Sequence, residues 1–295
     1  MQFGMMMLTG GRFGGGSEAM EAVRAVAQRA EALGFHALWI PDHVIFPSTI
    51  KSRYPYNETG QLPIPTDINL MDPIPVLSFL AGVTQKIRLG TWVLVMPLRN
   101  PIVTAKMFAT VDVLSQGRIT LGAGIGWLAE EMEILGSPFN KRSTITDEYL
   151  RAMKELWTNP DPQFAGQYTR FSGIKCQPKP IQQPLPVWIG GHSARAMRRV
   201  VELGDGWLTA PTSLTAFHES YTALTAAAEK AGRDVKKIPI LVCPSSEPTV
   251  DSYLEGMKPY RDLGFDSFVV PIGFWRGDRD SMLQVMDEFA SKAKM

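Results

Sequence analysis

Residues 33–43 read Leu-Gly-Phe-His-Ala-Leu-Trp-Ile-Pro-Asp-His, and this stretch contains one complete junction of the fold. Gly34 stands where an apolar pattern of helical spacing stops, a position that glycine commonly takes just after a helix. The run from His36 to Ile40 is short and apolar, as in a buried strand, and it stops at Pro41-Asp42-His43. A helix, then a strand, then polar residues at the carboxyl end of the strand is the order typical of α/β proteins.

The same order recurs along the chain. We expect strands at residues 2–8, 36–40, 87–95, 118–122, 187–189, 206–209, 238–243 and 268–271. Helical patterns follow them at residues 17–33, 72–84, 102–114, 144–157 and 193–203, and again after each of the last three strands. Eight parallel βα units predict a (β/α)8 TIM barrel of the α/β class, in one domain over residues 1–295. A doubly wound open sheet would show the same local pattern, but no Gly-x-Gly-x-x-Gly follows the first strand.

Three segments interrupt this order. A glycine-rich loop, residues 9–16, follows the first strand. Residues 45–69 form a long polar insertion after the second strand, and its length and its Tyr54 and Tyr56 make it a candidate lid. Residues 158–184, after the fourth strand, are rich in proline and lack a helical period, so we expect an insertion with a hairpin there.

The composition excludes several classes of function. Thirty basic and twenty-nine acidic side chains leave a net charge of +1, which gives no electrostatic reason to bind nucleic acid or a membrane surface. The sequence contains no run of about 18 apolar residues, so it predicts no membrane span. Two distant cysteines, Cys176 and Cys243, and a first segment without secretory features favour free thiols and a cytoplasmic protein. Four scattered histidines give no metal-ligand spacing, so we expect no metal site.

Catalytic groups of such a barrel are expected beyond the carboxyl ends of its strands. The residues there are mostly apolar, aromatic, Met or Gly, which suits a large planar cofactor better than nucleophilic or two-carboxylate chemistry. We expect Met7, Trp39, Tyr54 and Trp127 to bind substrate. The pair Asp42-His43 is the candidate catalytic element, with one residue entering the pocket while the other supports it; His43 could equally be an ordinary loop histidine.

Two glycine-rich turns are candidates for cofactor contact. Gly190-Gly191-His192-Ser193 joins a strand to a helix, and the free N–H groups at the start of that helix would favour a phosphate. An ordinary capped turn is the alternative. Gly124 and Gly126 leave backbone bare, so that a flat ring could lie against it. Glu130 and Glu131 follow in a short helix, and stabilisation of its N-terminus suffices to explain them.

Four motifs, in this order along the chain, closely resemble the bacterial luciferase-like family, within it the branch that uses the deazaflavin coenzyme F420. They are residues 33–43, residues 87–101 (Ile-Arg-Leu-Gly-Thr-Trp-Val through Leu-Arg-Asn-Pro), residues 117–127 (Gly-Arg through Gly-Trp), and residues 186–207 (Pro-Val-Trp-Ile-Gly-Gly through Leu-Gly-Asp-Gly-Trp). The resemblance spans nearly the whole chain and is weakest at residues 45–69 and after Thr212. It implies the same barrel fold.

The resemblance also implies roles for individual residues. Asp42 and His43 match a pair beside the deazaflavin ring, with His43 as proton partner or ring contact. Trp92-Val93 matches a non-prolyl cis peptide behind the ring. Gly190, Gly191, His192 and Ser193 match the turn that holds the cofactor phosphate. The implied activity is hydride transfer between F420 and a small organic substrate, and relatives suggest a homodimer.

Other functions stay open at this point. FMN with molecular oxygen would give a luciferase-like monooxygenase on the same platform, with a separate cofactor reductase as partner. A non-catalytic ligand-binding barrel is a further alternative. The acidic tail of F420 would favour a basic rim, for which Lys175, Lys179, Arg195 and Arg199 are candidates. Relatives that oxidise sugar phosphates carry a glutamate beyond the fourth strand, where this chain has Gly124-Ile125-Gly126, so we do not expect that activity here.

Overall fold

The computed structural model describes residues 1–9, 17–245, 248–276 and 278–295, so most of the glycine-rich loop expected at residues 9–16 lies outside it. The strands of the main sheet are β1 (Gln2–Met6), β2 (Ala37–Ile40), β3 (Arg88–Thr91), β4 (Leu94–Val95), β5 (Ile119–Gly124), β8 (Val187–Gly190), β9 (Gly206–Thr209), β10 (Ile240–Val242) and β11 (Ser267–Val270). All their pairings are parallel.

The sheet closes on itself. Its order is β3-β2-β1-β11-β10-β9-β8-β5-β4, and β3 also pairs with β5, Leu89 opposite Ile119 and Gly90 opposite Thr120. β4 continues the line of β3 after a two-residue interruption and also pairs with β5. The predicted (β/α)8 barrel is therefore confirmed, and the open-sheet alternative is excluded because an open sheet has no pairing between its two ends.

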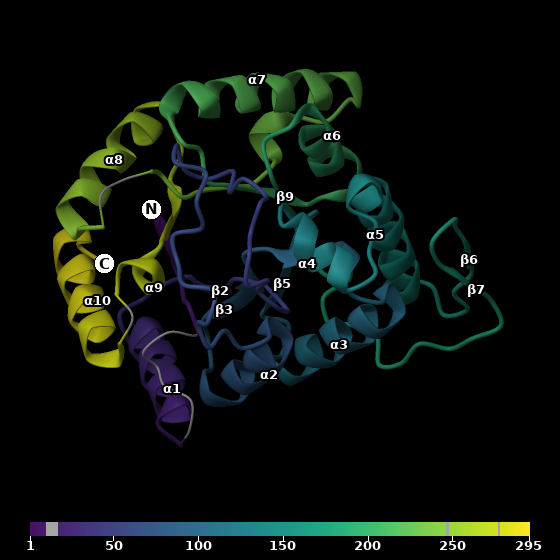
Figure 1. Ribbon diagram of the computed structural model, residues 1–295, viewed down its shortest axis with the longest axis horizontal. Coiled ribbons are helices and arrows are strands. Elements are labelled where there is room, and N and C mark those ends of the chain that lie inside the picture. The colour runs from purple at the N-terminus through teal and green to yellow at the C-terminus, as the bar shows by residue number, and fades with distance from the viewer. Residues whose placement is uncertain (10–16, 246–247, 277) are drawn as a thin grey trace.

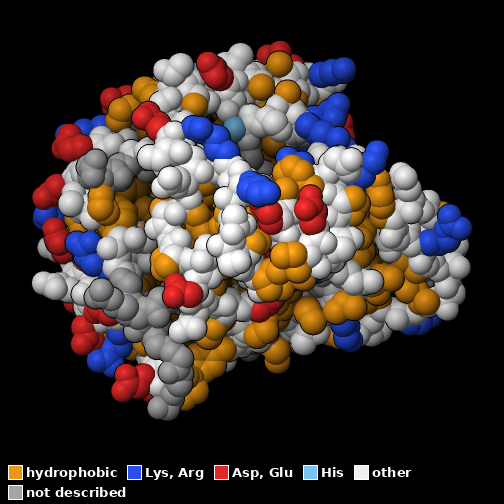
Figure 2. Space-filling model, in the orientation of Figure 1, with side chains coloured by type: hydrophobic (Ala, Val, Ile, Leu, Met, Phe, Trp, Pro, Cys, Tyr) orange, Lys and Arg blue, Asp and Glu red, His pale blue; other side chains and the backbone are white. Residues whose placement is uncertain are grey.

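Helices surround the barrel as a ring (Figure 1). They are α1 (Ser17–Ala32), α2 (Pro73–Val83), α3 (Pro101–Leu114), α5 (Arg142–Thr158), α6 (Ala194–Leu203), α7 (Leu214–Lys230), α8 (Val250–Asp262) and α10 (Arg279–Ala293). Two short helices, α4 (Ala129–Ile134) and α9 (Ile272–Trp275), lie in loops after strands. Among the described residues, no helix combines the length and the apolar character needed to cross a membrane. Charges of both signs are interspersed over the face shown in Figure 2.

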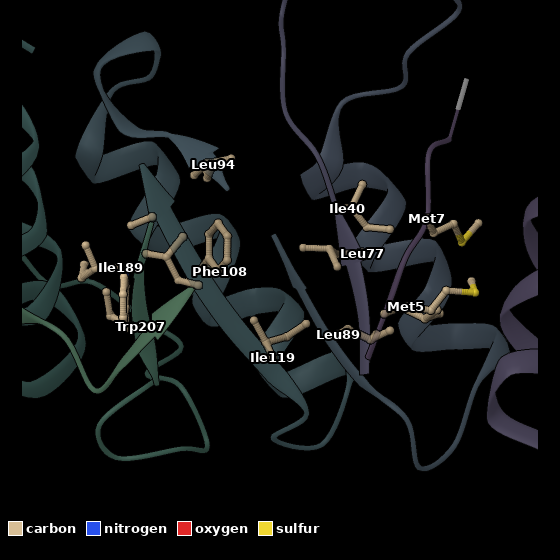
Figure 3. Packing of buried hydrophobic residues seen from close by; sticks show 14 of the residues in the cluster. Met5, Met7, Ile40, Leu77, Leu89, Leu94, Phe108, Ile119, Ile189 and Trp207 are labelled. Carbon is tan, nitrogen blue, oxygen red and sulfur yellow. The ribbon is translucent and has the colours of Figure 1, made fainter. Parts of the chain in front are cut away.

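The main hydrophobic core lies between the strands and the helices (Figure 3). Successive side chains of a strand point to opposite faces, so Phe3, Met5 and Met7 face the helices whereas Gly4 and Met6 face the barrel interior. Met7 is fully buried in this core. The expectation that Met7 binds substrate was therefore wrong, because the alternation of the first strand directs its side chain away from the barrel mouth.

Trp39 also differs from its predicted role. It is 4% exposed and belongs to the small core inside the barrel, where its indole lies near those of Trp92 and Trp188. A Cβ atom added at Gly4 would lie 2.7 Å from Trp39 Nε1, and one at Gly90 would lie 2.5 Å from its ring. The neighbouring strands carry glycine because the indole occupies that space. Trp39 is thus part of the barrel filling and not of a substrate-binding wall.

The two predicted insertions have different structures. Residues 41–72 contain no helix or strand, and Figure 1 shows this segment running across the centre of the ring of helices. The later insertion contains an antiparallel hairpin, β6 (Phe164–Ala165) and β7 (Arg170–Phe171), as expected. The hairpin projects beyond α5 at the edge of the molecule, far from the barrel axis (Figure 1).

Candidate active site

A cavity of about 470 Å³ lies at the carboxyl ends of the barrel strands, and the insertion after β2 contributes to its wall. The sequence-predicted residues in this wall are Asp42, His43, Tyr54, Trp92, Val93, Gly124, Gly126, Trp127, Gly190, Gly191 and His192. The described wall does not include Met7, Trp39 or Ser193. Residues from five separate parts of the sequence therefore meet in one place, at the end of the barrel where this fold carries active sites.

His43 is held at the cavity by a carboxylate. Its Nδ1 atom lies 2.8 Å from Oε2 of Glu131, and the two side chains are 13% and 2% exposed. The other oxygen of Glu131 accepts hydrogen bonds from the backbone N–H groups of Val44, at 2.7 Å, and Ile45, at 3.2 Å. Because an ionised carboxylate only accepts hydrogen bonds, Nδ1 of His43 carries the proton and Nε2 is the ring nitrogen left to meet a ligand.

Asp42 supports the site from behind. Its carboxylate receives two hydrogen bonds from the Arg99 guanidinium, at 2.6 and 2.7 Å, and one from the backbone N–H of Val95, at 2.8 Å. Burial raises the pKa of the Asp42 carboxyl, and the Arg99 guanidinium opposes that effect. With both oxygens engaged, Asp42 is a positioning residue: it fixes the chain after β2 to the chain after β3. This corrects its assignment as a catalytic group.

The segment between β3 and β4 forms the floor of the cavity. The peptide bond between Trp92 and Val93 is cis, in agreement with the expectation from the resemblance. A Cβ atom added at Gly124 would lie 2.2 Å from Val93 Cγ2, and one added at Gly190 would lie 2.8 Å from Val93 Cγ1. These glycines therefore make room for the Val93 side chain. The expectation that Gly124 simply leaves backbone bare for a ring needs this correction.

The turn after β8 has the expected local structure. Gly191 has φ +114°, a conformation that side-chain-bearing residues rarely adopt, and Ser193 caps α6 by accepting a hydrogen bond from the N–H of Ala196 at 3.2 Å. The first two N–H groups of α6, those of Ala194 and Arg195, have no acceptor within the helix, so they can receive an anion. His192 lines the cavity, its Nε2 is 3.0 Å from Thr209 Oγ1, and burial lowers its pKa.

The predicted basic rim is not formed. Arg199 is 3% exposed and pairs with Asp147, and Arg195 pairs with the same carboxylate at 2.9 Å. Lys179 donates to the carbonyl oxygens of Leu156 and Asn159, and Lys175 pairs with Asp161. Arg195 and Arg199 therefore connect α6 to α5, and Lys175 and Lys179 hold the second insertion in place. In the described wall there is no Lys or Arg.

Aromatic rings form an arc across the mouth of the cavity. Neighbouring rings meet edge to face with centroid separations of 5.2 to 6.2 Å. The arc runs through His43, Trp127, Tyr54, Tyr56 and His192. It joins the ends of β2, β5 and β8 through two tyrosines of the insertion, so this insertion closes part of the cavity.

Two consecutive glutamates of α4 hold the insertion in place. Glu131 binds the backbone at Val44 and Ile45, and Glu130 accepts hydrogen bonds from the N–H of Lys51, the N–H of Ser52 and the Ser52 hydroxyl. Glu131 is 1% exposed. From the sequence alone both residues are expected only to stabilise the helix, and this misses their role in holding the insertion. The only signal for this role in the sequence is that two consecutive glutamates stand close to the glycine-rich end of a strand. Their hydrogen-bond partners lie about eighty positions earlier in the chain, so no local pattern indicates them.

Comparison with known proteins agrees with this geometry. Residues 1–281 match the model of the luciferase-like monooxygenase family. The chain belongs to that family. An uncharacterized protein from Mycobacterium tuberculosis is 32% identical over 252 residues, which cover 85% of this chain and 86% of the relative. Monooxygenase RslO1 from Streptomyces bottropensis has a similar fold, with TM-score 0.79 and 18% identity over 99% of this chain and 98% of RslO1.

Two relatives are named for different cofactors. One is an F420-dependent glucose-6-phosphate dehydrogenase from Amycolatopsis mediterranei, 30% identical over 62% of this chain and 51% of the relative. The other is an FMNH2-dependent dimethylsulfone monooxygenase from Pseudomonas putida, 29% identical over 57% of this chain and 47% of the relative. Relatives of this luciferase-like protein thus include one named for a deazaflavin and one named for a flavin.

Proposed function

We propose that this protein transfers a hydride between coenzyme F420 and a small organic substrate. The observation that carries the proposal is the His43–Glu131 pair, because it provides a proton-transfer group at the wall of an otherwise apolar cavity. Hydride transfer to a carbonyl, or from an alcohol, needs such a group for the accompanying proton. A non-catalytic ligand-binding barrel would have no need for a histidine fixed by a buried carboxylate.

The residues present fit a cofactor of this shape. The cavity volume of about 470 Å³ is in the range of small-molecule sites, and its floor is the apolar segment Trp92-Val93. At one edge of the cavity, the first N–H groups of α6 and the Gly190-Gly191 turn could receive a phosphate. The structure thus offers an apolar surface for a planar ring next to an anion-binding helix start.

When bound, the deazaflavin would supply a ring carbon that gives or accepts the hydride. The part of His43 would be to hold a proton at Nε2 and exchange it with the substrate oxygen. Glu131 would keep the Nδ1–H of His43 oriented and stabilise the imidazolium form. The insertion, with Tyr54 and Tyr56, would exclude water from the two reacting molecules.

A second candidate is an FMN-dependent monooxygenase that uses molecular oxygen and a separate reductase. One observation favours it: the described cavity wall contains no free lysine or arginine that could bind the acidic tail of F420. FMN has no such tail and would need only the helix start for its phosphate. The platform and the histidine would serve either cofactor.

Titration of the purified protein with F420 and, separately, with FMN tests the proposal, with quenching of tryptophan fluorescence as the signal. We expect saturable F420 binding at least tenfold tighter than FMN binding. The reverse order would favour the monooxygenase. If neither cofactor bound, both functions would be rejected.

The phosphate assignment has its own test in Ala194→Asp, compared with Ala194→Asn. Ala194 is exposed at the first position of α6, where a carboxylate stabilises the helix, so the fold should tolerate the change. The carboxylate would repel a phosphate at the same N–H groups. We expect cofactor affinity to fall at least tenfold in Ala194→Asp and to change little in Ala194→Asn. Equal affinities in both variants would place the phosphate elsewhere.

A further inference from the structure

We propose that the substrate is an uncharged, largely apolar molecule with a single hydrogen-bonding oxygen, such as a ketone or an alcohol. The proposal concerns the substrate of the function proposed above and rests on its assignment of the cavity as the reaction site. Three properties of the described wall carry it: it contains no lysine or arginine, the carboxylates of Asp42 and Glu131 are already paired, and the rest of its surface is mostly apolar or aromatic.

Apart from Asp42 and His43, which are considered below, the polar groups of the described wall are neutral. Tyr54 and Tyr56 are uncharged at neutral pH, because the ordinary pKa of a tyrosine hydroxyl is about 10, and burial raises the pKa of Tyr54 further. Burial likewise lowers the pKa of His192 and favours the uncharged imidazole. Asn57 and Ser245 complete the polar set with an amide and a hydroxyl. These groups can hydrogen-bond to a neutral oxygen, but none of them is a counter-ion.

The ions closest to the wall are already paired. Asp42 is bound by Arg99 and by the backbone of Val95, so neither its charge nor that of Arg99 is available to a ligand. Glu131 accepts hydrogen bonds from three groups and its side chain is 2% exposed. His43 is itself paired with Glu131, so it adds no unpaired cation to the wall. An anionic substrate would therefore meet no compensating cation in the described part of the site.

The physical consequence is a strong preference for neutral ligands. An ionised carboxylate or phosphate loses its hydration when it enters an apolar cavity, and without a counter-ion this loss is not offset. A neutral ketone loses much less and can accept a hydrogen bond from a tyrosine hydroxyl, or from Nε2 of His43 when the imidazole is protonated. The aromatic arc and the apolar side chains Leu62 and Ile64 of the insertion then cover the rest of the molecule.

Matched ligand pairs test this inference directly. Acetophenone and benzoate have the same shape, since a methyl group in one replaces a charged oxygen in the other; 2-octanone with heptanoate, and cyclohexyl methyl ketone with cyclohexanecarboxylate, are equivalent pairs. Binding to the cofactor-loaded protein, or to the protein alone if no cofactor binds, is measured by competition fluorescence at pH 7. We expect each ketone to bind at least tenfold more tightly than its carboxylate, and 1-phenylethylammonium to bind no better than acetophenone.

A charge introduced into the wall should reverse this preference. Ile64→Lys places a cation in the insertion that lines the cavity, and Ile181→Lys, at a side chain that is 56% exposed on the surface, is the matched control. We expect Ile64→Lys to lower the ratio of the carboxylate Kd to the ketone Kd at least tenfold, or to bring it below one. Ile181→Lys should leave this ratio unchanged. Circular dichroism and cofactor affinity of both variants establish that the fold is retained.

The outcomes separate the two proposals. Tighter binding of the carboxylates or of the ammonium compound, or no saturable binding of any of the three ketones, would overturn the neutral-substrate inference even if F420 binds well. Failure of F420 and FMN to bind would reject the proposed function, while the ligand pairs would still report the charge preference of the cavity. A preference that Ile64→Lys does not alter would show that these ligands bind outside this cavity, which would also overturn the inference.

Discussion

The Nδ1 atom of His43 lies 2.8 Å from Oε2 of Glu131, although 88 positions separate the two residues in the sequence. This contact joins the end of β2 to the short helix after β5. It also ties the start of the insertion to the same carboxylate, through Val44 and Ile45. The orientation of the proposed proton-transfer group and the position of the chain that covers the cavity therefore depend on one side chain.

The first prediction concerns this pair. Glu131→Gln keeps an oxygen that can accept from the Val44 and Ile45 N–H groups but removes the charge beside His43. We expect kcat/KM to fall about 10- to 100-fold, as for groups that orient another ligand or base. The control is Glu133→Gln, at an exposed carboxylate of the same helix, which should leave the rate unchanged.

A double-mutant cycle decides whether Glu131 acts through His43. His43→Ala alone should lower turnover by about 100-fold or more. In that background, Glu131→Gln should have little additional effect, because its partner is absent. Fully additive losses would contradict the pairing and would assign Glu131 to the fold alone.

The second prediction concerns the Asp42–Arg99 pair. Asp42→Asn leaves a half-buried guanidinium without its buried counter-ion, and removal of one partner from such a pair costs about 3–5 kcal/mol of unfolding free energy. The comparison is Asp72→Asn, because Asp72 contacts the same guanidinium at 2.7 Å but is 42% exposed. Asparagine can still cap α2 there, so we expect a loss of at most about 1 kcal/mol. Urea unfolding of both variants measures the difference, and equal losses would refute the distinction.

The third prediction concerns the packing of Val93. Gly124→Ala places a methyl group 2.2 Å from Val93 Cγ2, an overlap that should destabilise the protein by about 1–3 kcal/mol. Adding Val93→Ala should recover part of this loss, since it removes the clashing methyl groups. Gly82→Ala in α2 is the control, because nothing lies within 4 Å of the added atom. Thermal unfolding of the native protein, Gly124→Ala, Val93→Ala and the double variant measures the coupling between the two positions. If the losses of stability in the two single variants simply added in the double variant, the coupling would be disproved.

The fourth prediction concerns the attachment of the insertion at acid pH. Burial would raise the pKa of Glu130, but hydrogen bonds from the Ser52 hydroxyl and from backbone N–H groups lower it to about 2. A carboxyl whose folded-state pKa is depressed stabilises the protein above its unfolded-state pKa, near 4.5, and this contribution is lost as the pH falls toward 2.

Glu130→Gln isolates that contribution. The difference in unfolding free energy between the native protein and Glu130→Gln should be constant above about pH 5 and should shrink as the pH falls through the window between 4.5 and 2. Denaturant unfolding at a series of pH values measures it. A difference that grew on acidification would have the wrong sign for a depressed pKa.

The local sequence was sufficient for the barrel. Short apolar strand patterns, each followed by a helical pattern, predicted all eight βα units with boundaries close to those observed, although the strand expected at residues 87–95 is divided into β3 and β4. Cap signals such as Ser193 and the glycine turn before it operate within a few residues, and they too are read correctly from sequence. These features depend on the chain's local periodicity and turn chemistry, which the sequence contains directly.

Tertiary structure decided which side chains reach the cavity. The alternation of side chains along the first strand directs Met7 toward the helices. The Trp39 side chain lies inside the barrel, where the glycines at positions 4 and 90 leave room for it. Glu131 contacts His43 only because closure of the sheet brings the ends of β2 and β5 together. Arg195, expected at a basic rim of the cavity, instead pairs with Asp147. Sequence periodicity predicts the elements, whereas the partner of a charged group is set by long-range packing that no local pattern encodes.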